Sequence, residues 1–164
     1  MMIIRYAKDE DCHVIYNLHI ASIKHYCASV YSKAAITAWI KLKTPDEYKN
    51  NQPNKVVIVA EEGDEILGFG ILNAQKKSIE SLYIKPHMAG KGIGGILIKK
   101  IESIAQIKDI GELTLYSTIN SVSFYHHMGY QGEDNTVFKL STGDELDSVL
   151  MMKELSLEQS KERQ

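Results

Sequence analysis

The stretch HMAGKGIGGILIKK, His87 to Lys100, decides the fold, because it packs four glycines into six residues and then turns into an apolar helix. The helix is predicted over 93–107, where an apolar residue recurs every third or fourth position, at Ile93, Leu97, Ile101 and Ile104. Glycines lose more conformational freedom on folding than any other residue, so a plain flexible turn is a poor reason for four of them. Close approach of a ligand to the backbone is the better explanation.

Three kinds of phosphate site place glycines before a helix, and the neighbouring residues separate them. Gly90, Gly92 and Gly95 satisfy the G-x-G-x-x-G pattern of dinucleotide folds, but five residues separate them from the preceding strand. Glu112 has the spacing of the ribose-binding acid but stands at the start of the next strand, and only about seventy residues follow the glycines. A P-loop is excluded because no Lys-Ser or Lys-Thr pair follows. The remaining reading is an anion cradle, in which the backbone N–H groups of 91–95 and the helix dipole hold a pyrophosphate.

The composition of the 164-residue chain is that of an ordinary globular protein, with 44% hydrophobic and 24% charged residues. Its 19 basic and 21 acidic residues give a net charge of -2, which argues against a nucleic-acid-binding surface. The apolar runs are too short to span a membrane, and early charged residues argue against a signal peptide. Cys12 and Cys27 lack metal-site spacing, so no bound metal is expected. We therefore expect a cytoplasmic protein that binds neither nucleic acid nor membrane.

Hydrophobic periodicity predicts a single α+β domain over residues 1–155, followed by a polar tail over 156–164. Asp9, Asp11 and Ser32 are candidate helix caps. The predicted helices cover about 11–28, 33–43, 93–107 and 120–129, and the predicted strands cover 2–7, 55–62, 65–73, 78–85, 112–118, 135–140 and 147–155. A Gly-Asp hairpin signal joins the second and third strands, and a mostly antiparallel sheet is expected.

The glycine stretch and the strand before it resemble the acetyl-CoA segment of the GNAT superfamily of N-acyltransferases. LYIKPHMAGKGIGGILI, residues 82–98, resembles the pattern Gln/Arg-x-x-Gly-x-Gly/Ala after a strand that often ends Leu-Tyr-Val-x-Pro. Gly92 and Gly94 match this pattern, whereas Ala89 stands where Gln or Arg is usual, a departure that concerns one phosphate contact. The resemblance implies that acetyl-CoA is bound by Leu82, Tyr83, Ile84, Ala89, Gly90, Lys91, Gly92, Ile93, Gly94 and Gly95.

A second segment resembles the superfamily in the expected order along the chain. NSVSFYHHMGY, residues 120–130, is similar to Asn-x-x-Ala-x-x-Phe-Tyr-x-x-x-Gly-Phe/Tyr, with Ser123 in the usual Ala place. The resemblance implies that Asn120 and Ser123 contact CoA and that the Tyr125 hydroxyl protonates or hydrogen-bonds the departing CoA thiolate. A buried tyrosine at the margin of the core is the structural alternative for Tyr125.

The resemblance covers residues 3 to about 155 and implies the GNAT fold, a mixed, mostly antiparallel sheet of about six or seven strands with flanking helices. HYCASVYSKAAITAW, residues 25–39, also resembles one bacterial branch of the superfamily. The implied activity is transfer of acetyl from acetyl-CoA to a primary amine, of a small molecule or a peptide, by direct attack in a ternary complex. Superfamily members often pair through their closing strands, so a homodimer is compatible with this resemblance.

The base that deprotonates the amine is expected on the strand before the glycines. Glu80 lies there and is predicted to alternate in phase with Leu82 and Ile84, against Ile79, Ser81 and Tyr83; a solvated strand glutamate is the alternative. Candidate acceptor-lining residues, each of a kind that is more often plain packing, are His25, Tyr26, Tyr31 and Trp39.

A different class of function stays open beside the enzyme. A domain with the same fold could bind acyl-CoA as a sensor or interaction module without turnover, and the Ala89 departure favours this alternative.

Overall fold

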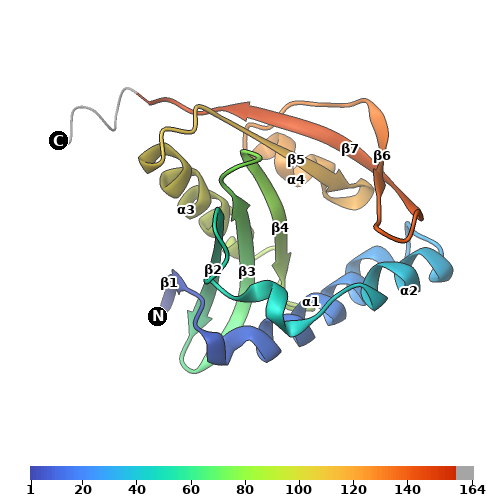
Figure 1. Ribbon diagram of the computed structural model, residues 1–164, viewed down its shortest axis with the longest axis horizontal. Helices are drawn as coiled ribbons and strands as arrows, with labels where there is room; N and C mark the ends of the chain where they lie inside the picture. Colours follow the sequence, from blue (N-terminus) through green and yellow to red (C-terminus); the bar gives the residue numbers. More distant parts are fainter. Residues whose placement is uncertain (158–164) are drawn as a thin grey trace.

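The computed structural model describes residues 1–157, which build one seven-stranded sheet with helices on both faces (Figure 1). The predicted tail lies outside the described residues from position 158 onward. The strands are β1 (Met2–Tyr6), β2 (Lys55–Glu62), β3 (Glu65–Asn73), β4 (Ser78–Ile84), β5 (Glu112–Thr118), β6 (Asn135–Lys139) and β7 (Glu145–Glu154). The helices are α1 (Cys12–Cys27), α2 (Lys33–Lys41), α3 (Ile93–Ile107) and α4 (Val122–His127), with 3-10 turns η1 (Asp9–Asp11), η2 (Pro45–Tyr48) and η3 (Ile119–Ser121).

The sheet has the strand order β1-β2-β3-β4-β5-β7-β6. Its neighbouring strands are antiparallel except for β4 and β5, which run parallel. The expected α+β class and the mixed, mostly antiparallel sheet are therefore confirmed. No helix within residues 1–157 is long and apolar enough to cross a bilayer.

The central strands β2 and β3 are buried on both faces, because α3 covers one face and α1 the other (Figure 1). Along β2, Ile58 and Ala60 belong to the core beneath α3, whereas Val57 and Val59 belong to the core beneath α1. All four side chains are fully buried. The uninterrupted apolar run in β2 is explained by this double covering, since a strand with one wet face would alternate.

Two glycines on β3 allow α3 to lie directly on the sheet. A Cβ atom at Gly70 would stand 2.7 Å from Ile101 Cδ1 of α3, and one at Gly68 would stand 2.9 Å from Ile84 Cδ1 of β4 and 3.2 Å from Leu97 Cδ1 of α3. Contacts this short force a neighbour to shift, so larger residues would disturb the packing of α3 on the sheet.

The strand β4 departs from the predicted alternation. Its pairing with β3 shifts by one residue, with Ile71 opposite Ser81 and Leu72 opposite Ile79, so Glu80 is left without a register partner. A bulge reverses the side-chain alternation beyond it. Ile79 therefore lies in the α3 core together with Leu82 and Ile84, and the prediction that it shares a face with Ser81 and Tyr83 is wrong.

Helix starts also differ in detail from expectation. Ser32 caps α2 as predicted, accepting a hydrogen bond from Ala35 N at 3.1 Å. Asp11 does not cap α1 with its side chain, and its carboxylate instead accepts from Lys8 N and from Arg5. Asp9 lies within η1 rather than at the start of α1.

Candidate active site

The glycine loop turns the chain sharply into α3. Gly90 and Gly92 have φ of 80° and 82°, in the left-handed region that favours glycine. Gly92 is the residue that precedes the first turn of α3, and its carbonyl accepts a hydrogen bond from Ile96 N at 3.2 Å. The first N–H groups of a helix have no partner within the helix, so this turn presents donors and a positive dipole to an anion. This geometry fits a pyrophosphate.

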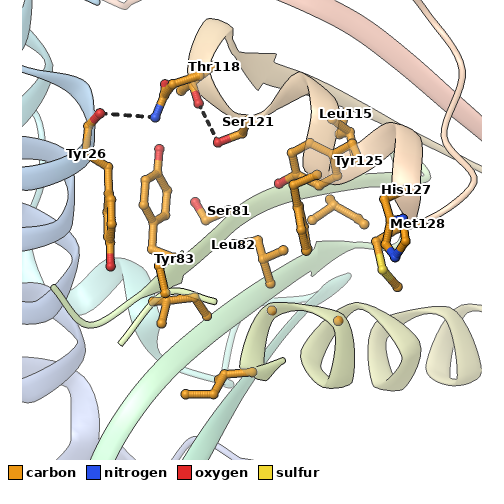
Figure 2. A pocket seen from close by; sticks show the side chains of 18 of the residues that line it. Tyr26, Ser81, Leu82, Tyr83, Leu115, Thr118, Ser121, Tyr125, His127 and Met128 are labelled. Carbon is orange, nitrogen blue, oxygen red and sulfur yellow. Dashed lines mark hydrogen bonds between the residues drawn. The ribbon is translucent and has the colours of Figure 1, made fainter. Parts of the chain in front are cut away.

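A cleft of about 830 Å³ opens between the start of α3, the strand β4 and the helix α4. Figure 2 shows Tyr26 and Tyr83 on one side of it, Tyr125 and Met128 on the other, and Leu82 between them. A Cβ atom at Gly94 would stand 3.1 Å from the Phe124 ring, so this glycine lets α3 and α4 approach across the cleft. Most of the predicted binding residues line it: Leu82, Tyr83, Ile84, Ala89, Gly90, Gly92, Ile93, Gly94, Gly95 and Asn120.

Two of the residues predicted to contact CoA do not line the cleft. The side chains of Lys91 and Ser123 are exposed, and neither residue lines the cleft. Lys91 Nζ lies 3.8 Å from Met88 Sδ. Lys99, in the second turn of α3, does line the cleft, and it is the lysine that the structure offers to a bound anion there.

The strand β4 separates from β5 beside the cleft. Within the described residues the two strands share one register pair, Ser78 with Thr114. Beyond this pair, α1 reaches the β4 end instead: Ser22 Oγ donates to Ile84 O at 2.7 Å and Tyr26 Oη donates to Lys85 O at 3.0 Å. The carbonyl of Ile84 is therefore already engaged, although its resemblance-based role was to contact CoA.

Tyr125 projects from α4 into the cleft (Figure 2). The residue is 8% exposed, and within residues 1–157 its hydroxyl has no hydrogen-bond partner. Burial raises the pKa of the Tyr125 phenol well above its ordinary value, so the group is a neutral O–H donor at physiological pH. A neutral donor that is not already committed suits a group that must hold or protonate a thiolate.

Glu80 sits at the bulge of β4, and both of its carboxylate oxygens are held. Oε1 accepts from Asn73 Nδ2 at 2.7 Å, and Oε2 lies 3.1 Å from Lys55 Nζ. This position is compatible both with a catalytic base and with a solvated strand glutamate, because Glu80 is an exposed residue although its carboxylate has two partners.

A second cavity of about 360 Å³ lies on the other face of the sheet, between α1, α2 and the strands β5, β6 and β7. Tyr31 and Trp39 line this cavity, whereas Tyr26 lines the cleft and His25 lines neither; His25 packs on Tyr26 and His87. The two spaces border each other through shared residues at the separation of β4 from β5: Ile79, Glu80, Ser81, Tyr83, Leu115, Tyr116 and Thr118.

Several lining residues were missed from the sequence. Thr118 and Ser121 are two of them, and Thr118 Oγ1 donates to Ser121 Oγ at 3.0 Å (Figure 2). Beside them Asn120, which the resemblance did imply, donates from Nδ2 to Tyr26 O at 3.1 Å and ties η3 to the end of α1. His19, Tyr48 and Ser148 line the second cavity. No short motif marks these positions, because they come together only through the packing of α1 and η2 and the pairing of β7.

Comparisons with known proteins agree with this geometry. The family model described as Acetyltransferase (GNAT) domain matches residues 27–141. A spermidine N(1)-acetyltransferase of Thermoplasma acidophilum is 33% identical over 143 residues, which cover 80% of this chain and 89% of that protein.

Two solved structures share the fold. A GCN5-related N-acetyltransferase from Rhodopseudomonas palustris has a TM-score of 0.83 at 24% identity, covering 93% of this chain and 95% of that one. The PaiA N-acetyltransferase of Thermoplasma acidophilum, in complex with coenzyme A, has a TM-score of 0.73 at 24% identity, covering 94% of this chain and 99% of that one. The matched domain and the curated relative together show that the chain is an acetyl-CoA-dependent acyltransferase and belongs to the GNAT superfamily.

Proposed function

We propose that the protein is an N-acetyltransferase that moves acetyl from acetyl-CoA to a primary amine by direct attack in a ternary complex. The observation that carries this proposal is the pair of spaces that meet where β4 and β5 separate. The donor occupies the cleft beside α3 and α4, and the amine enters from the cavity on the opposite face. Holding both reactants at one gap removes most of the entropic cost of their encounter.

The donor is held mainly by backbone. The loop that contains Gly90 and Gly92 faces its N–H groups toward the pyrophosphate, and Lys99 adds a positive charge on the same side. The pantetheine arm lies along the free edge of β4, next to Leu82 and beneath α4. Because the contacts are largely to backbone, loss of the usual side chain at Ala89 weakens this binding without abolishing it.

The transfer step uses two side chains at the gap. Acetyl-CoA supplies the thioester; the amine nitrogen forms a bond to its carbonyl carbon, the C–S bond breaks, and one amine proton leaves. The Tyr125 hydroxyl gives its proton to the departing sulfur, and the Glu80 carboxylate takes the amine proton directly or through water. Its hydrogen bond from Asn73 and ion pair with Lys55 hold that carboxylate in one orientation.

The acceptor panel begins with polyamines and simpler amines. The Thermoplasma relative is named for spermidine, so spermidine and putrescine belong in the panel beside monoamines and a peptide with a free N-terminus. The test is calorimetric titration with acetyl-CoA, with desulfo-CoA and adenosine diphosphate as controls, followed by thiol titration of the CoA released with each amine.

Micromolar binding together with amine-dependent CoA release is the expected result. Binding without release for any amine would support the alternative, a non-catalytic acyl-CoA sensor on the same fold. Absence of binding would contradict both functions.

A further inference from the structure

Two residues that line the second cavity each carry a buried polar atom without a hydrogen-bond partner. His19 Nε2 and Ser148 Oγ are the buried side-chain nitrogen and oxygen atoms without a hydrogen bond among the described residues. His19 is 1% exposed and Ser148 is 4% exposed, and both line this 360 Å³ cavity, from α1 and β7 respectively. A buried polar group without a partner is costly, so two such atoms on residues of one cavity point to a ligand that pairs them.

His19 is held rigidly in place. Its Nδ1 lies 2.8 Å from Tyr48 Oη, and its ring centroid lies 4.3 Å from the Tyr83 ring and 5.1 Å from the Phe69 ring. Burial, with a smaller contribution from Lys43, lowers the pKa of His19 well below its ordinary value, so the imidazole is neutral. Nε2 is therefore an N–H donor or a lone-pair acceptor, depending on which way the bond to Tyr48 runs.

The charges around the cavity cancel. Glu47 pairs with Lys43 at 3.7 Å, and Glu80 pairs with Lys55 at 3.1 Å. One further acid and one further base border the cavity without an ion pair in residues 1–157, Asp147 and Lys76.

Asp147 offers little to a ligand despite its position. It lies on β7 between Leu146 and Ser148, whose side chains are buried, and strand side chains alternate, so its carboxylate turns to the other face. Its backbone carbonyl faces Tyr31 and accepts the hydrogen bond of that hydroxyl. The cavity thus lacks the uncompensated carboxylates that two or three ammonium groups of a polyamine would need.

The remaining wall is largely aromatic. Six rings line the cavity: Tyr31, Trp39, Tyr48, Tyr83, Tyr116 and Phe138. Such walls suit a flat or apolar body, while a small number of fixed polar atoms decide which ligand is accepted.

We propose that the acceptor is a monoamine with an uncharged, mainly apolar body that carries a hydroxyl or similar group, and that His19 and Ser148 recognise its polar atoms. The inference rests on the proposed function and names its substrate class. A hydroxyl both donates and accepts, so it can pair with Nε2 in either tautomer of His19, whereas an ammonium can only donate. His19 is a specificity residue in this scheme, since it touches the acceptor away from the reacting nitrogen.

The probes are tyramine and phenethylamine, which differ only in one hydroxyl, with spermidine as the polycationic comparison. In the unaltered protein we expect kcat/KM for tyramine to exceed that for phenethylamine by about tenfold, the effect of one neutral hydrogen bond, and to exceed that for spermidine. His19→Asn keeps a polar atom near Nδ1 and removes Nε2, so the ratio should fall to about one. His19→Gln keeps a polar atom near Nε2 and should retain most of the ratio.

Ser148→Ala is the variant that does not threaten folding, because its hydroxyl has no protein partner to lose. It should lower kcat/KM for tyramine about tenfold with an unchanged melting temperature. Calorimetric binding of tyramine and phenethylamine to the protein–CoA complex repeats the comparison without turnover.

The outcomes separate the two proposals. A preference for spermidine, or equal use of tyramine and phenethylamine, overturns the inference while amine-dependent CoA release leaves the proposed function standing. If no amine releases CoA, the proposed function fails, and the binding comparison alone then decides whether the cavity discriminates the hydroxyl.

Discussion

The strands β2 and β5 belong to the same sheet but have different surroundings. The central residues of β2 are fully buried, because α3 and α1 cover its two faces. On β5, Leu113 and Leu115 are buried against the α3 core, whereas Tyr116, on the opposite face, is 51% exposed. Its neighbour on β7, Leu150, is likewise 47% exposed.

The difference shows where the fold keeps space for chemistry. The strands β1 to β4 form a first layer whose central strands β2 and β3 are covered on both faces, and β5, β7 and β6 form a second layer that is less completely covered on the face opposite α3. The two layers meet through a single register pair, Ser78 with Thr114, and both cavities border this junction. The well-packed strands β1 to β4 make the site rigid, and the loose junction with β5 leaves room for the two reactants.

The largest expected effect comes from filling the glycine cradle. Gly92 has a φ of 82° and a Cβ position with nothing within 4 Å, so the side chain of Gly92→Trp would project into the open cleft. We expect acetyl-CoA affinity, measured by calorimetry, to fall at least about 100-fold. Gly143→Trp is the matched control, because Gly143 has a φ of 90° and equally open surroundings but lies in the β6–β7 turn. Unchanged affinity in a folded Gly92→Trp protein would contradict the cradle.

Removal of the Tyr125 hydroxyl tests the wall of the cleft that α4 forms. Tyr125→Phe should lower kcat about 100-fold and leave the acetyl-CoA dissociation constant unchanged, because the proposed proton transfer matters only as the C–S bond breaks. Tyr130→Phe is the control: Tyr130 is 1% exposed, and its hydroxyl donates to Glu102 Oε1 at 3.3 Å, away from the cleft. It should lose stability and keep kcat. Equal kcat in Tyr125→Phe and the unaltered protein would remove Tyr125 from the mechanism.

The cleft was largely predictable from the sequence, and the second cavity was not. Gly92, Gly94 and Tyr125 lie in two contiguous segments whose local pattern carries the recognisable signal, and the structure brings them to one cleft. His19 looks like an ordinary helix residue between Leu18 and Ile20. Its importance appears only once burial leaves its Nε2 without a partner, which depends on residues distant in sequence.

The bulge at Glu80 shows the same limit for a strand. Alternation within β4 is a local property, and by itself it places Ile79 and Leu82 on opposite faces. The register shift against β3 places them on the same face, and it depends on how the two strands pair. Sequence periodicity therefore located the strand but could not give the direction of each side chain.

The contrast between the two layers can be sharpened with glycine substitutions. Gly68→Ala and Gly70→Ala press a methyl group against Ile84 and Ile101, at 2.9 and 2.7 Å, so each should lower the free energy of unfolding by about 1–3 kcal/mol. At the start of the second layer, a Cβ at Gly111 would meet Leu157 Cδ1 at an ordinary 3.6 Å. Gly111→Ala should be neutral or stabilising by up to about 1 kcal/mol. Urea unfolding measures these free energies, and an equal loss of stability in Gly68→Ala and Gly111→Ala would mean that the two layers are packed alike.

The smallest expected effect is a pH dependence confined to the first layer. Arg5 on β1 lies between Asp11, at 2.7 Å from Nη1, and Glu61 on β2, at 2.9 Å from Nε. The hydrogen bond from Arg5 lowers the pKa of Asp11 below its ordinary value of 3.8, although burial opposes the shift. Between the folded and unfolded pKa values the unfolded chain binds more protons, so this stabilisation is present above pH 3.8 and is lost as the pH falls through the folded pKa.

Asp11→Asn should therefore lower stability at neutral pH and flatten the loss of stability below pH 3.8, as followed by urea unfolding from pH 7 to pH 3. Asp64→Asn, in the exposed turn between β2 and β3, should keep the unaltered profile. If Asp11→Asn loses stability on acidification as steeply as the parent, the Arg5–Asp11 contact does not carry the acid sensitivity, and Glu61→Gln, at the other partner of Arg5, is the next variant to follow.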